Sequence, residues 1–335
     1  MKQLKTSSLM ATLACCLATV IHANDSGAPY IANYQDNKQA ALSFTFDDGF
    51  RAEVNDALEI IDPLDIRGTF FIIPHYMEGS ERRDSMINWE EAIALHAKGQ
   101  ELGTHGTTKN KLHEIDDGVL DFEVNGGWQL IKERTGVTTV AYAAPGGSSI
   151  DERVEAKVSE HHFAIRNKNI LPASVIMSYG SVGKRVWDDV ATRVQIEAAI
   201  KNGEWFVPLV HAIVAGYSPF KSKKEFRSHC EWIASKREVL WVAPLGEVGA
   251  YVFQKEASAL EIIESKPNGI KLKLAQTEPT PFEYGSELTV VIPVSGASEA
   301  EAESNTQGEL EVVIEKDLIR FNALPDGEAI TVYWN

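Results

Sequence analysis

Cysteine is scarce in this sequence, with three in 335 residues. Two of them, Cys15 and Cys16, lie in an apolar N-terminal segment, so only Cys230 lies beyond it. Without that segment the chain has no internal pair of cysteines, which excludes a disulfide framework. Stability must then come from hydrophobic cores, and a hydrophobic content of 44% is typical of a globular protein. The length suits one large domain and one small one.

Positive charge is also scarce, since Lys and Arg total 32 against 48 Asp and Glu, which gives a net charge of −16. Phosphate groups would be repelled, so we expect neither nucleic acid nor an anionic membrane surface as a partner. A neutral or cationic ligand fits this balance better. Beyond the N-terminal segment no hydrophobic run is long enough to predict a membrane span.

The N-terminal segment has the pattern of a signal peptide. Lys2 and Lys5 precede the apolar run Leu9–Val20, and Ala23 supplies a small residue at a cleavage point. We therefore expect residues 1–23 to be removed and the mature protein to be secreted or periplasmic. A lipid anchor at Cys15 is less favoured, because the residues before it match a lipoprotein signal poorly.

Between residues 24 and 255 strand patterns alternate with helix patterns. This alternation predicts a parallel sheet, and about seven units favour an α/β fold in the form of a distorted (β/α) barrel. The strand patterns are Ala41–Phe46, Gly68–Ile73, Glu101–Thr104, Thr138–Ala143, His162–Arg166, Trp205–His211 and Val239–Ala243. Helix patterns include Trp89–Lys98, Val119–Arg134, Glu152–Glu160, Asp188–Lys201 and Lys223–Lys236.

Residues 256–335 show a different pattern, with short alternating strands and no helix. We predict a small all-β domain here, with a sandwich as its candidate architecture. We expect it to serve as a spacer in preference to a glycan-binding module. The acidic stretch Ser295–Gly308 predicts a loop.

Polar side chains follow several of the barrel strands, on the face where such barrels place their active sites. They are Asp47 with Asp48, His105, Pro145 with the two glycines after it, and His211. Two adjacent carboxylates repel each other unless a cation or a proton compensates one of them. A metal ion bound to one carboxylate would remove this repulsion and leave the other carboxylate free to act as a base. The pair therefore predicts a metal-assisted hydrolase.

The segments Thr45–Gly49, Gly68–Phe71 and Gly99–His105 resemble motifs of the NodB-homology polysaccharide deacetylases, carbohydrate esterase family four. The resemblance covers roughly residues 40–251. It implies an acetylated glycan as substrate and a divalent metal ion as cofactor, with zinc favoured. It also implies roles for four residues: Asp47 as catalytic base, Asp48 and His105 as metal ligands, and His211 as general acid.

Three positions depart from the family pattern. Lys109 stands where a second histidine is expected, four residues after His105. Zinc sites generally have three protein ligands, so His113 is our candidate for the third, with His75 behind it. If neither binds, the metal site is weak or absent.

The third motif, at residues 143–147, lacks the arginine that orients the catalytic aspartate in the family. Arg166 is the candidate for that role, although the sequence favours the alternative of a structural arginine at the surface. The backbone at Pro145 and Gly146 is the candidate oxyanion site. The fourth motif is matched best by Trp187 and Asp188. Trp187 is the candidate for an apolar wall of the substrate site, and Asp188 is the candidate partner of His211. A helix-capping role for Asp188 fits equally well.

Two other functions stay open. One is a non-catalytic glycan-binding protein on the same barrel, and the other is a metal-free hydrolase of a different C–N bond, such as that of a cyclic imide. A serine-esterase mechanism has little support, because no serine lies in a nucleophile elbow. The sequence distinguishes neither N- from O-deacetylation nor one oligomeric state from another.

Overall fold

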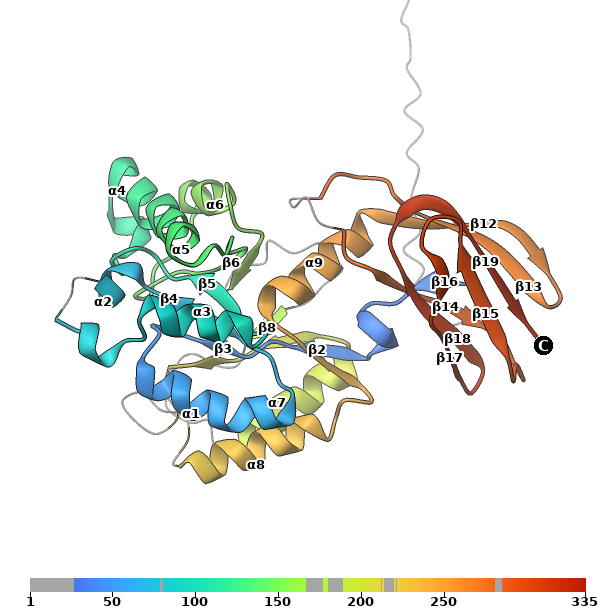
Figure 1. Ribbon diagram of the computed structural model, residues 1–335, viewed down its shortest axis with the longest axis horizontal. Helices are drawn as coiled ribbons and strands as arrows, with labels where there is room; N and C mark the ends of the chain where they lie inside the picture. Colours follow the sequence, from blue (N-terminus) through green and yellow to red (C-terminus); the bar gives the residue numbers. More distant parts are fainter. Residues whose placement is uncertain are drawn as a thin grey trace, which may run out of the picture.

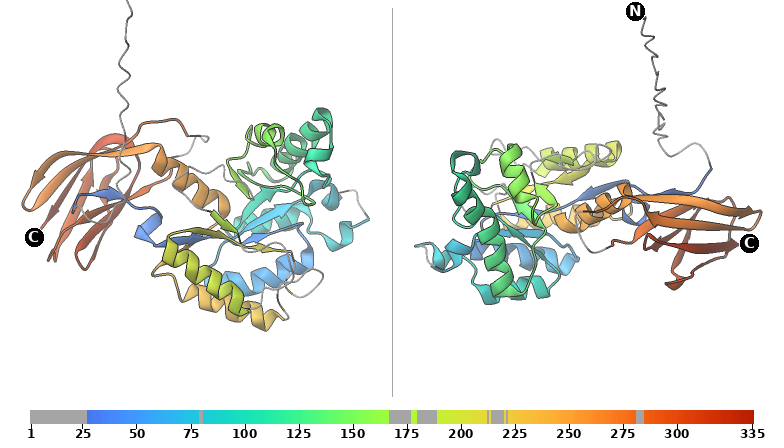
Figure 2. Two further views of the ribbon diagram at one scale, coloured as in Figure 1. Left: turned by 180° about the vertical axis from the view of Figure 1, so that it is seen from behind. Right: turned by 90° about the horizontal axis from the view of Figure 1, so that it is seen from above.

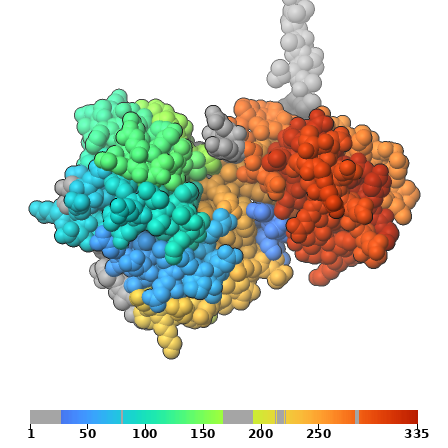
Figure 3. Space-filling view, in the orientation of Figure 1, coloured from blue at the N-terminus to red at the C-terminus, as the bar shows by residue number. Residues whose placement is uncertain are grey.

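The structure is a computed structural model that describes residues 27–78, 81–166, 177–179, 189–211, 213, 220, 222–280 and 285–335. The expected signal peptide, Trp187 and Asp188 lie outside the described residues. Two parts are visible as separate lobes, a barrel domain and an all-β domain (Figures 1 and 3). Helix α9 (Leu245–Glu256) runs between them.

The barrel domain is built on parallel strands, as predicted. One sheet has the order β10-β3-β4-β5-β6-β7 and the other has the order β11-β2-β9-β8, and each pairing within them is parallel. The strands are β2 (Ala40–Leu42), β3 (Thr45–Phe46), β4 (Thr69–Ile72), β5 (Glu101–Thr104), β6 (Ala141–Ala143), β7 (Ala164–Arg166), β8 (Met177–Tyr179), β9 (Trp205–Val207), β10 (Leu209–Val210) and β11 (Leu240–Val242).

Helices cover these strands from both sides, with α1 and α8 on one side and α4, α5 and α6 on the other (Figure 1). Because both faces are covered, the strands are mostly apolar, and rings such as Phe46 and Phe70 stack in the core with centroids 4.5 Å apart. The helices are α1 (Arg51–Ile61), α2 (Pro74–Glu78), α3 (Trp89–Ala97), α4 (Asp117–Asp121), α5 (Gly127–Thr135), α6 (Glu152–Val158), α7 (Asp189–Asn202) and α8 (Lys223–Ala234).

The all-β domain is a sandwich of two antiparallel sheets, seen edge-on in Figure 2. Their inner faces share one core, in which Leu272 and Val332 of one sheet join Val290 and Phe321 of the other. One sheet holds β1 (Tyr30–Ile31), β14 (Leu288–Pro293), β18 (Leu318–Ala323) and β17 (Val312–Glu315), and the other holds β12 (Ser258–Lys266), β13 (Gly269–Gln276), β19 (Asp326–Trp334), β15 (Ala300–Ser304) and β16 (Gly308–Leu310).

The prediction of a loop over residues 295–308 is wrong for its middle part, which forms β15. Ala302 and Ser304 are buried while Glu301 and Glu303 are exposed, so small and acidic residues alternate with the period of a strand. The acidic composition concealed this alternation. None of the helices in the described part of the chain is long and apolar enough to cross a membrane.

The two domains are tied together near the start of the described chain. Strand β1 pairs with β14 of the sandwich, and the hydroxyl of Tyr251 on α9 donates to the carbonyl of Ala32 at 3.0 Å. The carboxylate of Asp36 accepts from Arg320 at 3.0 Å and from Asn322 at 3.1 Å. These bonds place the sandwich against the N-terminal side of the barrel strands.

A buried histidine supports strand β5, which leads into the site. His162 is 2% exposed, its Nδ1 donates to the Val158 carbonyl at 3.1 Å, and its Nε2 faces the Thr104 hydroxyl at 3.0 Å. Burial lowers the pKa of His162 from its ordinary value of 6.5 to about 3. The imidazole is therefore neutral in the folded protein across the physiological range.

This neutral histidine predicts a loss of stability in acid. Below about pH 6.5 the unfolded chain takes up a proton that folded His162 does not, so the free energy of unfolding falls by about 1.4 kcal/mol per pH unit toward pH 3. Above pH 6.5 this contribution is constant. Urea unfolding at pH 7.5 and 5.0 measures it, and the His162→Gln variant should have the smaller pH dependence. An identical pH dependence in both proteins would contradict the assignment.

Candidate active site

Five charged or titratable residues meet at the carboxyl ends of the barrel strands. Asp47 and Asp48 directly follow β3, His105 follows β5, Arg166 ends β7 and His211 follows β10. Because parallel strands present these ends at one edge, residues distant in sequence come together there. The structure thus brings together five of the residues that the sequence singled out.

Asp47 is paired with Arg166 in a buried bidentate ion pair. Arg166 Nη1 and Nη2 each donate to one Asp47 carboxylate oxygen at 2.6 Å, and Nη1 also donates to the Thr45 hydroxyl at 2.9 Å. Both side chains are at most 3% exposed. Burial raises the pKa of Asp47, but Arg166 above all, with His105 and His211, lowers it to about 2. Asp47 is therefore a carboxylate, and Arg166 orients it.

His105 presents an unprotonated nitrogen to both aspartates. Its Nδ1 donates to the Ala143 carbonyl at 2.8 Å, which leaves a lone pair on Nε2. Nε2 lies 3.5 Å from Asp48 Oδ1 and 3.8 Å from Asp47 Oδ2. Burial lowers the pKa of His105, so its neutral form is favoured. A lone pair that faces carboxylates in this way calls for a positive group nearby.

That positive group is Lys109, whose ammonium forms an ion pair with Asp48 Oδ1. The Asp48 side chain is 5% exposed and that of Lys109 is 21% exposed. Both residues have left-handed backbone conformations, with φ of 74° and 72°. Such a conformation is strained in a residue other than glycine, so the surrounding structure must impose it.

The buried carboxylate of Glu123 holds the loop that carries Lys109 and so imposes the left-handed backbone conformation of Lys109. This carboxylate accepts from the backbone N–H groups of Thr107 at 2.9 Å and Thr108 at 3.0 Å, and from the Asn110 amide at 2.8 Å. Glu123 lies in a π-helical turn, Phe122–Gly126, which interrupts the single helix predicted over residues 119–134. Such turns occur frequently at functional sites.

Sequence reasoning missed Glu123, although Gly126 and Gly127 within the helical pattern were a signal. A Cβ on Gly127 would lie 3.0 Å from the Gly106 carbonyl oxygen, so the loop and the helix approach each other closely.

The structure does not bring His113 or His75 to Asp48. His113 Nδ1 accepts from the Ser149 backbone N–H at 3.0 Å, and its Nε2 is 3.7 Å from Glu114. His75 lies on α2 beside Tyr76, with ring centroids 6.4 Å apart. The bonds of the 106–110 loop direct Lys109 to Asp48 instead. Among the described residues, no three His, Cys, Asp or Glu side chains are grouped to hold a metal ion.

Asp48 and His105 therefore supply two of the three protein ligands that a zinc site needs. Two ligands of a tetrahedral zinc ion, each about 2.0–2.1 Å from the metal, lie about 3.4 Å apart. The separation of 3.5 Å between Asp48 Oδ1 and His105 Nε2 matches this geometry. The third position holds the ammonium of Lys109, which has no lone pair to donate. The residues present do not fit a three-ligand zinc site.

His211 is the member of this group that solvent reaches most easily. Its side chain is 34% exposed, and its Nε2 lies 3.9 Å from Asp47 Oδ2. The turn at Pro145 and Gly146 lies beside the Lys109 loop, since a Cβ on Gly146 would lie 3.6 Å from the Lys109 carbonyl oxygen. A substrate that reaches His211 from solvent therefore meets this turn and Lys109 on the same side of the barrel.

Glu53, on the first turn of α1, is a further buried acid that sequence reasoning missed. Both of its carboxyl oxygens are buried without a hydrogen-bond partner. Burial first, and then the negative charges of Asp47 and Asp48, raise the pKa of Glu53 well above its ordinary value. The uncharged form of Glu53 is therefore favoured in the folded protein. Its place beside Val54 on the apolar face of a helix was the available signal.

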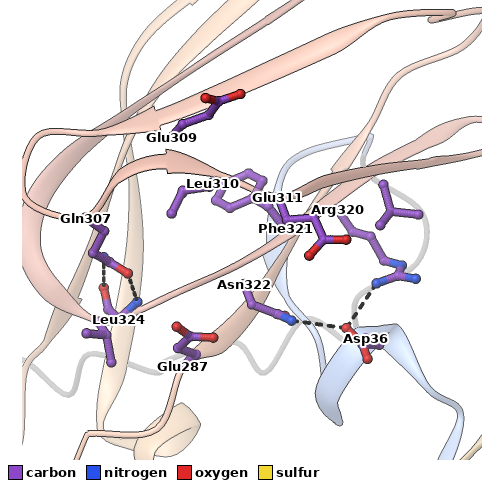
Figure 4. A pocket seen from close by; sticks show the side chains of 11 residues that line it. Asp36, Glu287, Gln307, Glu309, Leu310, Glu311, Arg320, Phe321, Asn322 and Leu324 are labelled. Atoms are coloured by element: carbon purple, nitrogen blue, oxygen red, sulfur yellow. Dashed lines mark hydrogen bonds and ion pairs between the residues drawn. The ribbon is translucent and has the colours of Figure 1, made fainter.

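The all-β domain contains a separate hollow of about 760 Å³, shown in Figure 4. Its lining is mostly polar and includes Glu287, Glu309 and Glu311. Arg320 is already paired with Asp36, and the aromatic residue of the lining, Phe321, is 2% exposed. A sugar ring therefore finds no aromatic surface on this lining to stack on.

Removal of Arg166 tests the buried ion pair. Arg166→Met should lower the free energy of unfolding by about 3–5 kcal/mol, because it leaves the Asp47 charge buried and unpaired. Arg153→Met is the matched control, since Arg153 pairs with exposed Asp117 and its loss should cost at most about 1 kcal/mol. Urea unfolding at pH 7.5 measures both. Equal midpoints for the two variants would show that the pair does not form.

Comparisons with known proteins agree with this fold. The polysaccharide deacetylase family model matches residues 34–165. A Mycobacterium smegmatis protein named as a polysaccharide deacetylase has a similar structure, with a TM-score of 0.53 and 17% identity over 68% of this chain and 94% of that one. A Pseudomonas aeruginosa protein named likewise has a TM-score of 0.51 and 12% identity over 63% of this chain and 90% of its own.

A search of the curated proteins found no match. The two solved structures share the barrel fold with this chain, and the family model covers the strands that carry Asp47, Asp48 and His105. Residues 34–165 of the barrel domain therefore match the polysaccharide deacetylase family model, and the barrel has the fold of the two solved structures.

Proposed function

We propose that this protein is a secreted hydrolase that removes acetyl groups from a carbohydrate. The observation that carries the proposal is the oriented Asp47 carboxylate, fixed by Arg166 and facing His211 at the solvent side of the site. An anionic base and a histidine acid that can both reach a bound acyl group are what acyl hydrolysis requires. The net charge of −16 favours a neutral or cationic glycan over an acidic one.

The proposed reaction joins water to the acetyl carbon. Asp47 accepts one proton from the attacking water as its oxygen bonds to the carbonyl carbon. His211, in its protonated form, then gives a proton to the sugar oxygen or nitrogen as the bond from that atom to carbon breaks. The products are acetate and a free hydroxyl or amino group, and proton exchange with solvent restores both side chains. The backbone N–H groups of Gly146 and Gly147, in the turn that Pro145 begins, are candidates to bind the negative oxygen of the intermediate.

A divalent metal ion, which the family resemblance implies, takes no part in these steps. The reason is the donor set described above, in which Lys109 stands at the third ligand position. Secretion remains part of the proposal and rests on the N-terminal pattern alone. N-terminal sequencing of the exported protein tests it, with Asn24 expected as the first residue.

Acetate release tests the activity. The mature protein should release acetate from an O-acetylated xylan or from N-acetylglucosamine oligomers, and Asp47→Asn should lower the rate by about 10²–10⁴-fold. Asp56→Asn is the matched control, because Asp56 is on the following helix and pairs with Lys223 at the surface. It should leave the rate unchanged.

Undiminished turnover in Asp47→Asn would remove Asp47 as the base. Binding of these glycans without acetate release from any of them would favour the alternative of a non-catalytic glycan-binding protein. Release of a product other than acetate, from a cyclic imide for example, would favour the alternative of a different C–N hydrolase.

A further inference from the structure

We propose that the Lys109 ammonium occupies the cation position of this site, so that the native protein binds no divalent metal there and uses a side-chain charge in its place. The catalytic consequence rests on the proposed function, whereas the exclusion of metal does not. Three features of the described residues support the inference: the charges around Asp48, the rigidity of the Lys109 loop, and the spacing of the two remaining donors.

The first feature is the distribution of charge. Asp47 and Asp48 are adjacent buried carboxylates, and the bidentate bond from Arg166 compensates Asp47. Asp48 pairs with Lys109 on the same oxygen that lies 3.5 Å from His105 Nε2. A dication between Asp48 and His105 would have to displace this ammonium or lie against it, and like charges at such a distance repel strongly in a poorly solvated site.

The second feature is the rigidity of the loop. An exposed lysine ordinarily extends into solvent on a flexible stem, but Lys109 starts from a strained backbone with φ of 72°. Glu123 is fully buried and accepts hydrogen bonds along residues 107–110, including one from the Thr108 hydroxyl. A loop held in this way directs the ammonium into the site.

The third feature is the spacing of Asp48 and His105, which suits two ligands of a single ion. The site therefore lacks one donor, at the position of Lys109, and needs only that donor to bind zinc. For catalysis, the ammonium offers three N–H donors and one positive charge. Placed beside the acyl group, it would stabilise the oxygen that becomes negative during attack.

Zinc binding distinguishes the two possibilities without any assay of activity. We would dialyse the mature native protein against zinc, remove free metal by gel filtration and measure bound zinc by elemental analysis. The native protein should hold no stoichiometric zinc. Lys109→His supplies the missing nitrogen donor and should bind about one zinc per chain, as a three-ligand site does.

Two control variants locate the bound metal. Lys111→His places a histidine two residues away on the same stretch, where the native lysine pairs with exposed Glu114, and it should bind no zinc. Asp48→Asn combined with Lys109→His should lose the zinc that Lys109→His gains. Stoichiometric zinc in the native protein, lost in Asp48→Asn, would overturn the proposal.

Activity provides the second readout. Acetate release by the native protein should be unchanged by dipicolinate, and Lys109→Met should lower it at least about 10²-fold without rescue by zinc. Full turnover by Lys109→Met in dipicolinate would refute the catalytic role of the ammonium. If no variant releases acetate, the proposed function fails, while the zinc measurements on folded native protein still decide what occupies the cation position.

Discussion

The site depends on the compensation of two adjacent buried carboxylates. Asp47 and Asp48 follow one strand directly and are 2% and 4% exposed, so neither charge is well solvated. An unpaired buried charge costs several kcal/mol, which means that each carboxylate needs its own positive partner. Arg166 supplies one and Lys109 supplies the other. His105 faces Asp48 and His211 faces Asp47, so each histidine lies beside a carboxylate that already has a positive partner.

The two cations are held by different means. Arg166 ends a strand of the barrel, and its guanidinium lies over the Phe71 ring at 5.0 Å, so the packed core fixes it. Lys109 lies in a loop and would be mobile without support. Buried Glu123 provides that support from a π-helical turn, whose Val124 also packs into a core with Tyr142 and Ile165 of the barrel strands. The site therefore has two ion pairs with different supports. Arg166 orients the Asp47 carboxylate from a strand, and Lys109 brings a positive charge to Asp48 from a loop.

Much of the fold could be predicted from the sequence. Each barrel strand expected from its apolar run is present, because burial on both faces gives parallel strands a strong local signal. The errors occur where local composition and tertiary contacts disagree. Ala300–Ser304 has the acidic composition of a loop, yet its alternating small residues pair with β19. Residues 122–126 have a helical pattern, yet the close approach of Gly127 to Gly106 and the bonds of Glu123 favour a π-helical turn.

The sequence by itself determined which residues stand at the strand ends, among them Asp47, Asp48, His105 and His211, because a strand pattern and the residue after it are local properties. The tertiary structure decided the partners of those residues, of which the sequence offered only Arg166 as a candidate, through the family resemblance. Arg166 is 119 positions from Asp47, and Lys109 is 61 positions from Asp48. No periodicity connects residues so far apart, and the cost of a buried charge is settled only when the folded chain brings a counter-charge to it. For the same reason the sequence favoured His113 as a metal ligand by spacing, whereas the folded loop presents Lys109.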